Sequence, residues 1–378
     1  HKSSSGSWER RTMAGAGATP LLPDEIVIWE ILVRLPPKSL LRCRSICRAW
    51  RSATSTRSFL LAHHGHQPNL PIISGGSNFL AFDHRAADDH LHTVARLDQV
   101  LHLQASCDGL LVLSRYGMTD TRISICNPAT REHAPLVAAW DLNIMGMYPH
   151  QPTGEYRLLL HRGTQTRWAF AAEDQIGCYI FTLGSGQPPR YIESSETAPR
   201  RFNLPVLLRD NLHWYPSLYQ VGAKPVIVFD TIAETFRQMR APIALGSSYI
   251  FEMDGTLGVY SRDLATKIVR VWVLQSYEGE VWDLKYRIKL PVAEIRARFE
   301  GFNSYWNTDV VSRDGGVLLV VSFGPWMLHV DSHGKLVDSF HRGGQGYCLN
   351  GFRLKQTLVQ HTFFTTLEGY AVNALPFV

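Results

Sequence analysis

One stretch near the N-terminus, residues 21–62, carries more large apolar side chains than a unit of its length can bury. Pro23 suits the first helical position and Pro36-Pro37 ends the run, so we expect a first helix over residues 24–35. Its apolar side chains fall nearly all the way round a helical wheel, interrupted only by Asp24, Glu25, Glu30 and Arg34. A helix that is apolar on most sides must be covered on most sides.

A second helix is expected over residues 39–52, with Ser39 as its N-cap. Its apolar side chains share one broad arc, and three arginines, Arg44, Arg48 and Arg51, lie outside that arc. A third short helix is expected around residues 59–61. Units of about forty residues are marginal even when well designed. The surplus apolar surface must therefore lie against another protein or against the rest of this chain.

The order and spacing of these residues resemble an F-box. The family pattern is a Leu-Pro pair, a hydrophobic helix ending in Leu-Pro, and a Val-Cys-Lys/Arg-x-Trp element, which here begins with Ile46. F-boxes bind a Skp-family adaptor inside Skp–cullin–F-box ubiquitin ligases, so the resemblance implies this adaptor, and through it a cullin, as partners. The positions expected to form the adaptor contact or the unit's own core, which the sequence does not separate, are Leu22, Pro23, Ile31, Leu32, Leu35, Pro36, Leu40, Ile46, Cys47 and Trp50.

Charge and cysteine content indicate the kind of partner and the cellular compartment. The net charge is +5, and residues 21–62 hold seven Lys and Arg against three Asp and Glu, so nearly all of the positive excess lies in this unit. This charge suits an acidic partner. Residues 1–20 are rich in small and polar residues, which predicts disorder and no secretory signal. The six widely spaced cysteines form no disulfide framework, which favours the cytoplasm or nucleus. No run is long enough for a transmembrane helix.

After an expected linker over residues 63–69, the pattern changes to short apolar runs separated by turn residues, which predicts an all-β domain over 70–378. A strand–turn–strand signal recurs at positions 83, 127, 183, 230, 275 and 331, with gaps of 44, 56, 47, 45 and 56 residues. A four-stranded propeller blade needs roughly 40–50 residues. The expected fold is therefore an α+β chain with a small three-helix domain and an all-β propeller of six blades, with seven as the alternative.

Tight turns before apolar strands are predicted at Asp108-Gly109, Asp210-Asn211, Asp254-Gly255 and Asp314-Gly315, because these residues tolerate the positive φ of two-residue hairpin turns. The segment 352–367 is expected to pair with strands near residues 72–82, which would close the ring and remove exposed edges.

The same residues resemble the F-box-associated β-propeller of plant F-box proteins. The clearest match is Cys107-Asp108-Gly109-Leu110-Leu111 followed by the run from Cys126 to Glu132, and further pieces follow in order over most of residues 70–378, less clearly from about residue 301. Aromatic side chains on the presumed loops are the candidates for binding a target protein, because Trp often anchors interfaces. They are Trp140, Tyr148, Trp306 and Trp326, and packing between blades is their alternative role.

Other chemistry finds little support. The histidines at positions 63, 64, 66, 90 and 92 lack a Cys or carboxylate pattern, so neither a metal nor a cofactor is expected. Cys43 and Cys47 suit a small-residue core role. The helical unit is too apolar for a solvated nucleic-acid reader, and the β domain shows no basic run. Ser312-Arg313-Asp314-Gly315-Gly316 partly matches a sialidase-type box but is better interpreted as a turn.

The resemblance implies a non-catalytic substrate receptor of a Skp–cullin–F-box ubiquitin ligase, which holds a target protein near enzymes on other subunits. Two alternatives stay open. One is a propeller enzyme of the glycan hydrolase type, which would need acidic residues converging at the central channel. The other is a scaffold that binds the adaptor without promoting ubiquitination.

Overall fold

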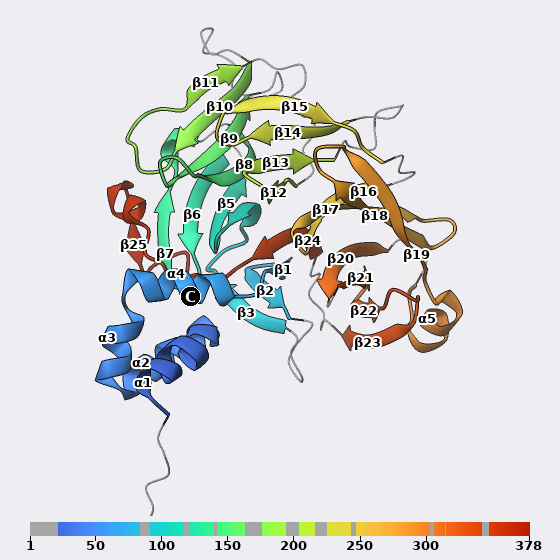
Figure 1. Ribbon diagram of the computed structural model, residues 1–378, viewed down its shortest axis with the longest axis horizontal. Coiled ribbons are helices and arrows are strands. Elements are labelled where there is room, and N and C mark those ends of the chain that lie inside the picture. Colours follow the sequence, from blue (N-terminus) through green and yellow to red (C-terminus); the bar gives the residue numbers. More distant parts are fainter. Residues whose placement is uncertain are drawn as a thin grey trace, which may run out of the picture. The chain divides into compact units, whose positions relative to one another are not determined.

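The computed structural model describes residues 22–83, 91–116, 121–139, 142–162, 176–193, 204–215, 225–242, 247–302, 306–313, 315–341 and 348–378. The chain forms two compact units, His1–His66 and Gln67–Val378. The first is helical and the second consists almost entirely of strands (Figure 1).

The first predicted helix exists, but its winding changes along its length. It comprises α1 (Asp24–Ile26), a π-helical turn η1 (Val27–Ile31) and a 3₁₀ turn η2 (Leu32–Arg34). Leu35 is extended, as expected for a residue that precedes proline, so Pro36-Pro37 ends the helix as predicted.

The second predicted helix is wrong in its bounds and in its continuity. Helix α2 (Pro37–Ile46) begins two residues earlier than expected, with proline at its first position and no side-chain cap from Ser39. Cys47 is extended (φ −129°, ψ 123°) and separates α2 from α3 (Arg48–Thr54). The apolar arc predicted for one continuous helix is therefore divided between two.

The third helix, α4 (Arg57–His66), is longer than predicted and includes residues 63–66, which the sequence assigned to a linker. His63 is the reason this turn belongs to the helical unit. Its side chain is fully buried, and its Nε2 lies 2.8 Å from the carbonyl oxygen of Leu35. The Phe59 ring packs against Trp29 at a centroid distance of 5.5 Å.

The second unit is a propeller of six blades, which confirms the favoured blade count. Each blade is a sheet whose first strand, in the order named below, lies at one edge. The blades are β24 (Cys348–Leu354), β1 (Leu70–Gly75), β2 (Asn78–Phe82) and β3 (Leu91–Arg96); β4 (His102–Cys107), β5 (Leu110–Tyr116), β6 (Thr121–Asn127) and β7 (Glu132–Pro135), extended by β25 (Ala371–Val372); β8 (Asn143–His150), β9 (Glu155–Arg162), β10 (Gly177–Thr182) and β11 (Arg190–Glu193); β12 (Val206–Leu208), β13 (Asn211–Trp214), β14 (Val226–Asp230) and β15 (Thr235–Met239); β16 (Ser247–Met253), β17 (Thr256–Asp263), β18 (Ile268–Ser276) and β19 (Val281–Lys289); and β20 (Asn307–Arg313), β21 (Gly316–Phe323), β22 (Trp326–Val330) and β23 (Leu336–His341).

Short helical segments complete this unit: η3 (Val137–Ala139), α5 (Val292–Arg298) and η4 (Thr362–Thr366). The described helices include none that is long and apolar enough to cross a membrane.

Each blade packs on both neighbours through buried apolar side chains. In β18, Val269, Val271 and Val273 face the sixth blade, whereas Trp272 and Leu274 face the fourth. Strands buried on both faces need near-continuous apolar runs rather than alternation. That requirement explains why short uninterrupted runs were the signal in the sequence.

The predicted repeat corresponds to one structural feature. Its anchors, positions 83, 127, 183, 230, 275 and 331, all lie at or next to the connection between the third and fourth strand of a blade. The tight turns predicted before apolar strands join the first and second strands of a blade, and we call them the inner turns. In two of them Asp108 and Asp254 have positive φ, and each is followed by a glycine at positive φ. In the fourth blade the positive-φ pair is Arg209-Asp210, one residue before the predicted pair.

The ring closes through the C-terminal part of the chain, as predicted, but with an earlier strand. β24 pairs antiparallel with β1, with Leu354 opposite Leu70 and Cys348 opposite Ser74. The predicted segment 352–367 overlaps β24 only at its start, because the pairing ends at Leu354. The first blade thus combines strands from both ends of the propeller sequence, which gives it four strands like the other blades.

Candidate functional site

The ten predicted adaptor positions separate by burial. Leu32 and Leu40 are buried and form part of the helical unit's own core. Leu35, Cys47 and Trp50 are half-buried. The exposed positions are Leu22, Pro23, Ile31, Pro36 and Ile46. The structure thus distinguishes core residues from residues available for a partner, which the sequence could not.

The helical unit exposes seven large apolar side chains, at 42% to 79% of their surface. We call this set the apolar docking surface: Leu22, Ile26, Trp29, Ile31, Leu41, Ile46 and Leu61. Four of them, Ile26, Trp29, Leu41 and Leu61, were not among the predicted site residues. The wheel pattern could have found Ile26 and Trp29, since it showed more apolar positions than one buried face can hold.

Ile46 is the most exposed of these side chains at 79%. It is the last residue of α2, and the extended backbone of Cys47 follows it. Single exposed apolar residues are ordinary, but seven large ones in one small helical unit make it a candidate interaction site.

The arginines of the helical unit divide into two kinds. Arg44 turns inward, where its Nε donates to Thr54 Oγ1 at 2.9 Å and its Nη2 donates to the Thr54 carbonyl. Arg42, Arg48 and Arg51 are exposed. The exposed arginines add positive charge to the surface of the helical unit, which suits an acidic partner.

The predicted target-binding aromatics do not form a surface. Tyr148 is fully buried against Phe229, and Trp306 is 3% exposed. Trp326 is half-buried, with its ring 4.9 Å from Phe299. Trp140 lies outside the described residues. The described three therefore pack inside the propeller, which was their alternative role, and Tyr148 and Trp306 are removed as docking residues.

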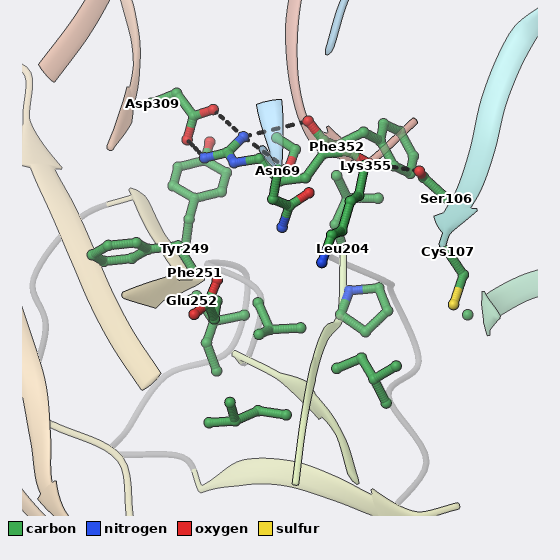
Figure 2. A pocket seen from close by; sticks show the side chains of 18 of the residues that line it. Asn69, Ser106, Cys107, Leu204, Tyr249, Phe251, Glu252, Asp309, Phe352 and Lys355 are labelled. Carbon is green, nitrogen blue, oxygen red and sulfur yellow. Dashed lines mark hydrogen bonds and ion pairs between the residues drawn. The ribbon is translucent and has the colours of Figure 1, made fainter. Parts of the chain in front are cut away.

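The innermost strands enclose a central cavity of about 830 Å³, shown in Figure 2. Every blade contributes to its lining, through Arg353, Ser106, Gly146, Val206, Glu252 and Asp309 among others. The sequence predicted Asp108, Asp210 and Asp254 as turn residues but assigned no binding residue to this cavity. The only available signal was the repeated Asp of the inner turns, since turns at one end of successive blades lie on the same face of the ring.

A partly buried ion pair spans the wall of this cavity at the ring seam (Figure 2). Arg353 on β24 donates from Nη1 and Nη2 to the two carboxylate oxygens of Asp309 on β20, at 2.7 and 3.1 Å. Burial opposes the charge, but Asp309 outweighs it and holds the pKa of Arg353 above its ordinary value. The Asp309 side chain is 5% exposed, and its Oδ1 also accepts from the Val310 N–H at 2.9 Å.

Carboxylates also line the cavity, and they come from the inner turns or the strands that lead into them. They are Asp108, Asp210, Glu252 and Asp254. Asp108 accepts from the Tyr156 hydroxyl at 3.0 Å, and Asp254 accepts from the Ser312 hydroxyl at 2.6 Å. The acidic residues that a glycan hydrolase would need are therefore present at the central channel.

No group of three potential metal ligands occurs among the described residues. Of the weighed histidines, His63 contacts the Leu35 carbonyl and His90 lies outside the described residues. Cys43 and Cys47 are free and half-buried, and burial raises the pKa of the Cys107 and Cys126 thiols in the propeller.

Comparison with known proteins agrees with both units. A family model described as F-box-like matches residues 19–63, and one described as F-box associated beta propeller domain matches residues 62–323. The F-box protein At5g49610 of Arabidopsis thaliana is 24% identical over 295 residues, covering 71% of this chain and 79% of that protein. The putative F-box protein At1g47730 of the same plant is 22% identical and covers 93% of this chain and 92% of its own length. The chain therefore belongs to the family of F-box proteins with an F-box-associated β-propeller domain.

Proposed function

We propose that this chain is the substrate-recognition subunit of a Skp–cullin–F-box ubiquitin ligase. The helical unit binds a Skp-family adaptor through the apolar docking surface, and the propeller binds the target protein. The observation that carries the proposal is the exposure of seven large apolar side chains in a unit that the F-box-like family model matches. Fully burying a large apolar side chain contributes about 1.5–3 kcal/mol relative to full exposure, and each of these side chains, at 42% to 79% exposed, can supply part of that when a partner covers it.

The chain's contribution to the reaction is proximity rather than catalysis. A receptor that holds its target beside a charged ubiquitin-conjugating enzyme makes an intermolecular transfer effectively intramolecular. The receptor requires no cofactor for this role, and we place it in the cytoplasm or nucleus, where ubiquitin ligases of this type work.

The test is co-expression with a plant Skp-family adaptor, followed by size-exclusion chromatography. We expect a stable 1:1 complex for the wild-type chain. Ile46→Asp and Ile31→Asp should abolish it, because each places a carboxylate in the apolar contact. Leu264→Asp is the matched control, since Leu264 is a 41% exposed propeller residue. Leu32 is unsuitable for this purpose because it is buried, and its substitution would unfold the unit.

Two outcomes would contradict the proposal: a soluble monomer that ignores the adaptor, or an Ile46→Asp variant that still binds it. A complex that forms but leaves the abundance of captured proteins unchanged in cells would instead support the scaffold alternative.

One observation favours a second function, a glycan hydrolase, because carboxylates line the central cavity. Such enzymes use a carboxylate pair, one as acid and one as base or nucleophile. Here, however, Glu252 accepts from the Gly255 N–H at 2.8 Å and Asp254 from Ser312, which are contacts that hold the inner turn and link two blades. We expect no release of nitrophenol from a panel of aryl glycosides; turnover that Glu252→Gln abolishes would establish the enzyme instead.

A further inference from the structure

The central cavity is narrowed by the segment that precedes β12. A Cβ added at Gly351 on β24 would lie 3.2 Å from Leu204 Cδ1, and one added at Gly146 on β8 would lie 3.2 Å from Pro205 Cγ. Residues 204–205 thus reach the inner strands of two other blades, and both glycines provide the necessary space. Figure 2 shows Leu204 among the side chains that surround the cavity.

Three of the lining carboxylates form no ion pair within the described part of the chain. Glu252 and Asp254 accept hydrogen bonds from a backbone N–H and a hydroxyl, and these neutral donors orient the carboxylates without cancelling their charge. Asp210 follows Arg209 in the inner turn of the fourth blade. No ion pair joins any of these three to a cation among the described residues.

The cations that line the cavity are mostly engaged elsewhere. Arg353 binds both oxygens of Asp309. Arg209 turns to Glu278 at 3.1 Å and lies over the Tyr277 ring at 4.9 Å. Lys355 is the remaining ammonium among the described lining residues. The described lining residues therefore include more carboxylates than cations, and a cleft lined mainly by one sign of charge concentrates ligands of the opposite sign.

A flexible organic cation fits this arrangement better than a metal ion. The described residues include no group of three side chains placed to hold a metal. Glu252 and Asp254 come from the fifth blade and Asp210 from the fourth, so the carboxylates are spread along the wall, where several long cationic side chains can meet them. The volume of about 830 Å³ lies within the range of roughly 300–1,000 Å³ that ligand sites occupy.

We propose that the central cavity of the propeller binds a lysine- or arginine-rich segment of the target protein. The inference rests on the proposed role of the propeller in target binding, and it defines the chemistry of the target as basic. Glu252, Asp254 and Asp210 receive the cationic side chains, and the apolar wall near Leu204 contacts their methylene stems.

The test uses fluorescence anisotropy of the full chain, in complex with the adaptor, and two labelled peptides that alternate Lys with Ser or Glu with Ser. The Lys peptide should bind, with affinity that falls as salt rises, and the Glu peptide should not. Glu252→Gln with Asp254→Asn should weaken binding of the Lys peptide at least tenfold. Asn tolerates the positive φ of position 254, so the turn is kept.

The matched control removes two negative charges away from the cavity, by Asp283→Asn on the outermost strand of the fifth blade and Glu300→Gln after α5. This control should leave peptide binding unchanged. Equal binding of both peptides, or equal losses in the two double variants, would overturn the inference. Adaptor binding is measured on the same samples: an adaptor complex that does not bind the Lys peptide defeats the cavity inference alone. If the chain forms no complex with the adaptor but still binds the Lys peptide, the proposed function is wrong and the cavity inference stands.

Discussion

The helical unit and the propeller treat apolar surface in opposite ways. The helical unit buries Leu32, Leu40 and Phe59 but leaves the seven side chains of the apolar docking surface exposed. The propeller buries seven of the eight residues of β21, and its six inter-blade cores run around the closed ring. A ring that closes on itself covers its own apolar surface, whereas a small unit without closure relies on a partner.

The largest expected effect breaks the closure of the propeller. Asp309→Asn should destabilise the propeller by about 3 kcal/mol, because the half-buried Arg353 would lose its carboxylate and keep only backbone carbonyls as acceptors. The measurement is the free energy of unfolding from urea denaturation. Glu294→Gln is the control, since it removes an exposed i,i+4 pair with Arg298 and should cost under about 0.5 kcal/mol.

Replacing both members of the pair sharpens this test. Asp309→Leu with Arg353→Met should recover much of the lost stability, because an apolar pair carries no unpaired charge. Failure of the double variant to exceed Asp309→Asn would show that the charges themselves are needed at the seam.

The next effect separates core from docking surface within the helical unit. Leu40→Ala should cost about 2–5 kcal/mol because Leu40 is fully buried, and amide exchange should rise across α2 and α4 while the propeller stays protected. Ile46→Ala should change stability by under about 0.5 kcal/mol and still weaken adaptor binding. Similar losses of stability in the two variants would refute the assignment of Leu40 to the core and Ile46 to the surface.

Two inner turns of the propeller offer a matched pair of glycines. Gly109 and Gly255 have similar positive φ, of 84° and 80°. A Cβ at Gly109 would lie 2.7 Å from the Lys355 carbonyl oxygen, whereas a Cβ at Gly255 would meet nothing within 4 Å. Gly255→Ala should therefore cost about 1 kcal/mol, from backbone strain alone, and Gly109→Ala clearly more. Equal free energies of unfolding for the two variants would show that the backbone at Lys355 moves away from the added methyl group without cost.

The smallest effect concerns pH and the helical unit. Burial lowers the pKa of His63, the Leu35 carbonyl raises it, and the charges of Arg44, His64 and His66 lower it further, so the net pKa is below its ordinary value. The unfolded chain then binds the proton more readily than the folded chain. The contribution of neutral His63 to the free energy of unfolding is therefore fully present above the ordinary pKa of about 6.5 and falls as pH drops below it. Amide exchange of α4 between pH 8 and pH 5.5 measures this, and His63→Gln should flatten the dependence. A stability that rises on acidification would show the opposite shift.

Much of the fold could be predicted because it depends on local chemistry. Pro36-Pro37 had to end the first helix, and the turn signals at Asp108-Gly109 and Asp254-Gly255 had to lie between strands. Spacing then set the blade count. The failures were local as well: nothing in the composition of α2 and α3 shows that Cys47 is extended, and nothing at His63 shows a bond to Leu35 that keeps the helix going.

The candidate sites were predictable only in kind. The surplus of apolar side chains indicated a docking surface, yet Leu40 and Ile46 lie in the same helix and on the same predicted arc, and only their packing shows that Leu40 is buried and Ile46 exposed. Tyr148 and Trp306 looked like loop anchors but pack between strands, since a side chain's burial depends on neighbours far along the chain.

The sequence by itself determined the family, the order of a helical unit and a β domain, the six-fold repeat and the excess of apolar surface, because these follow from residue types and their spacing. Tertiary structure alone decided which apolar residues face a partner, that Arg353 and Asp309 meet at the seam, and that carboxylates from separate blades share one cavity. These depend on contacts between residues up to hundreds of positions apart, and pairings at such distances leave no local pattern to read.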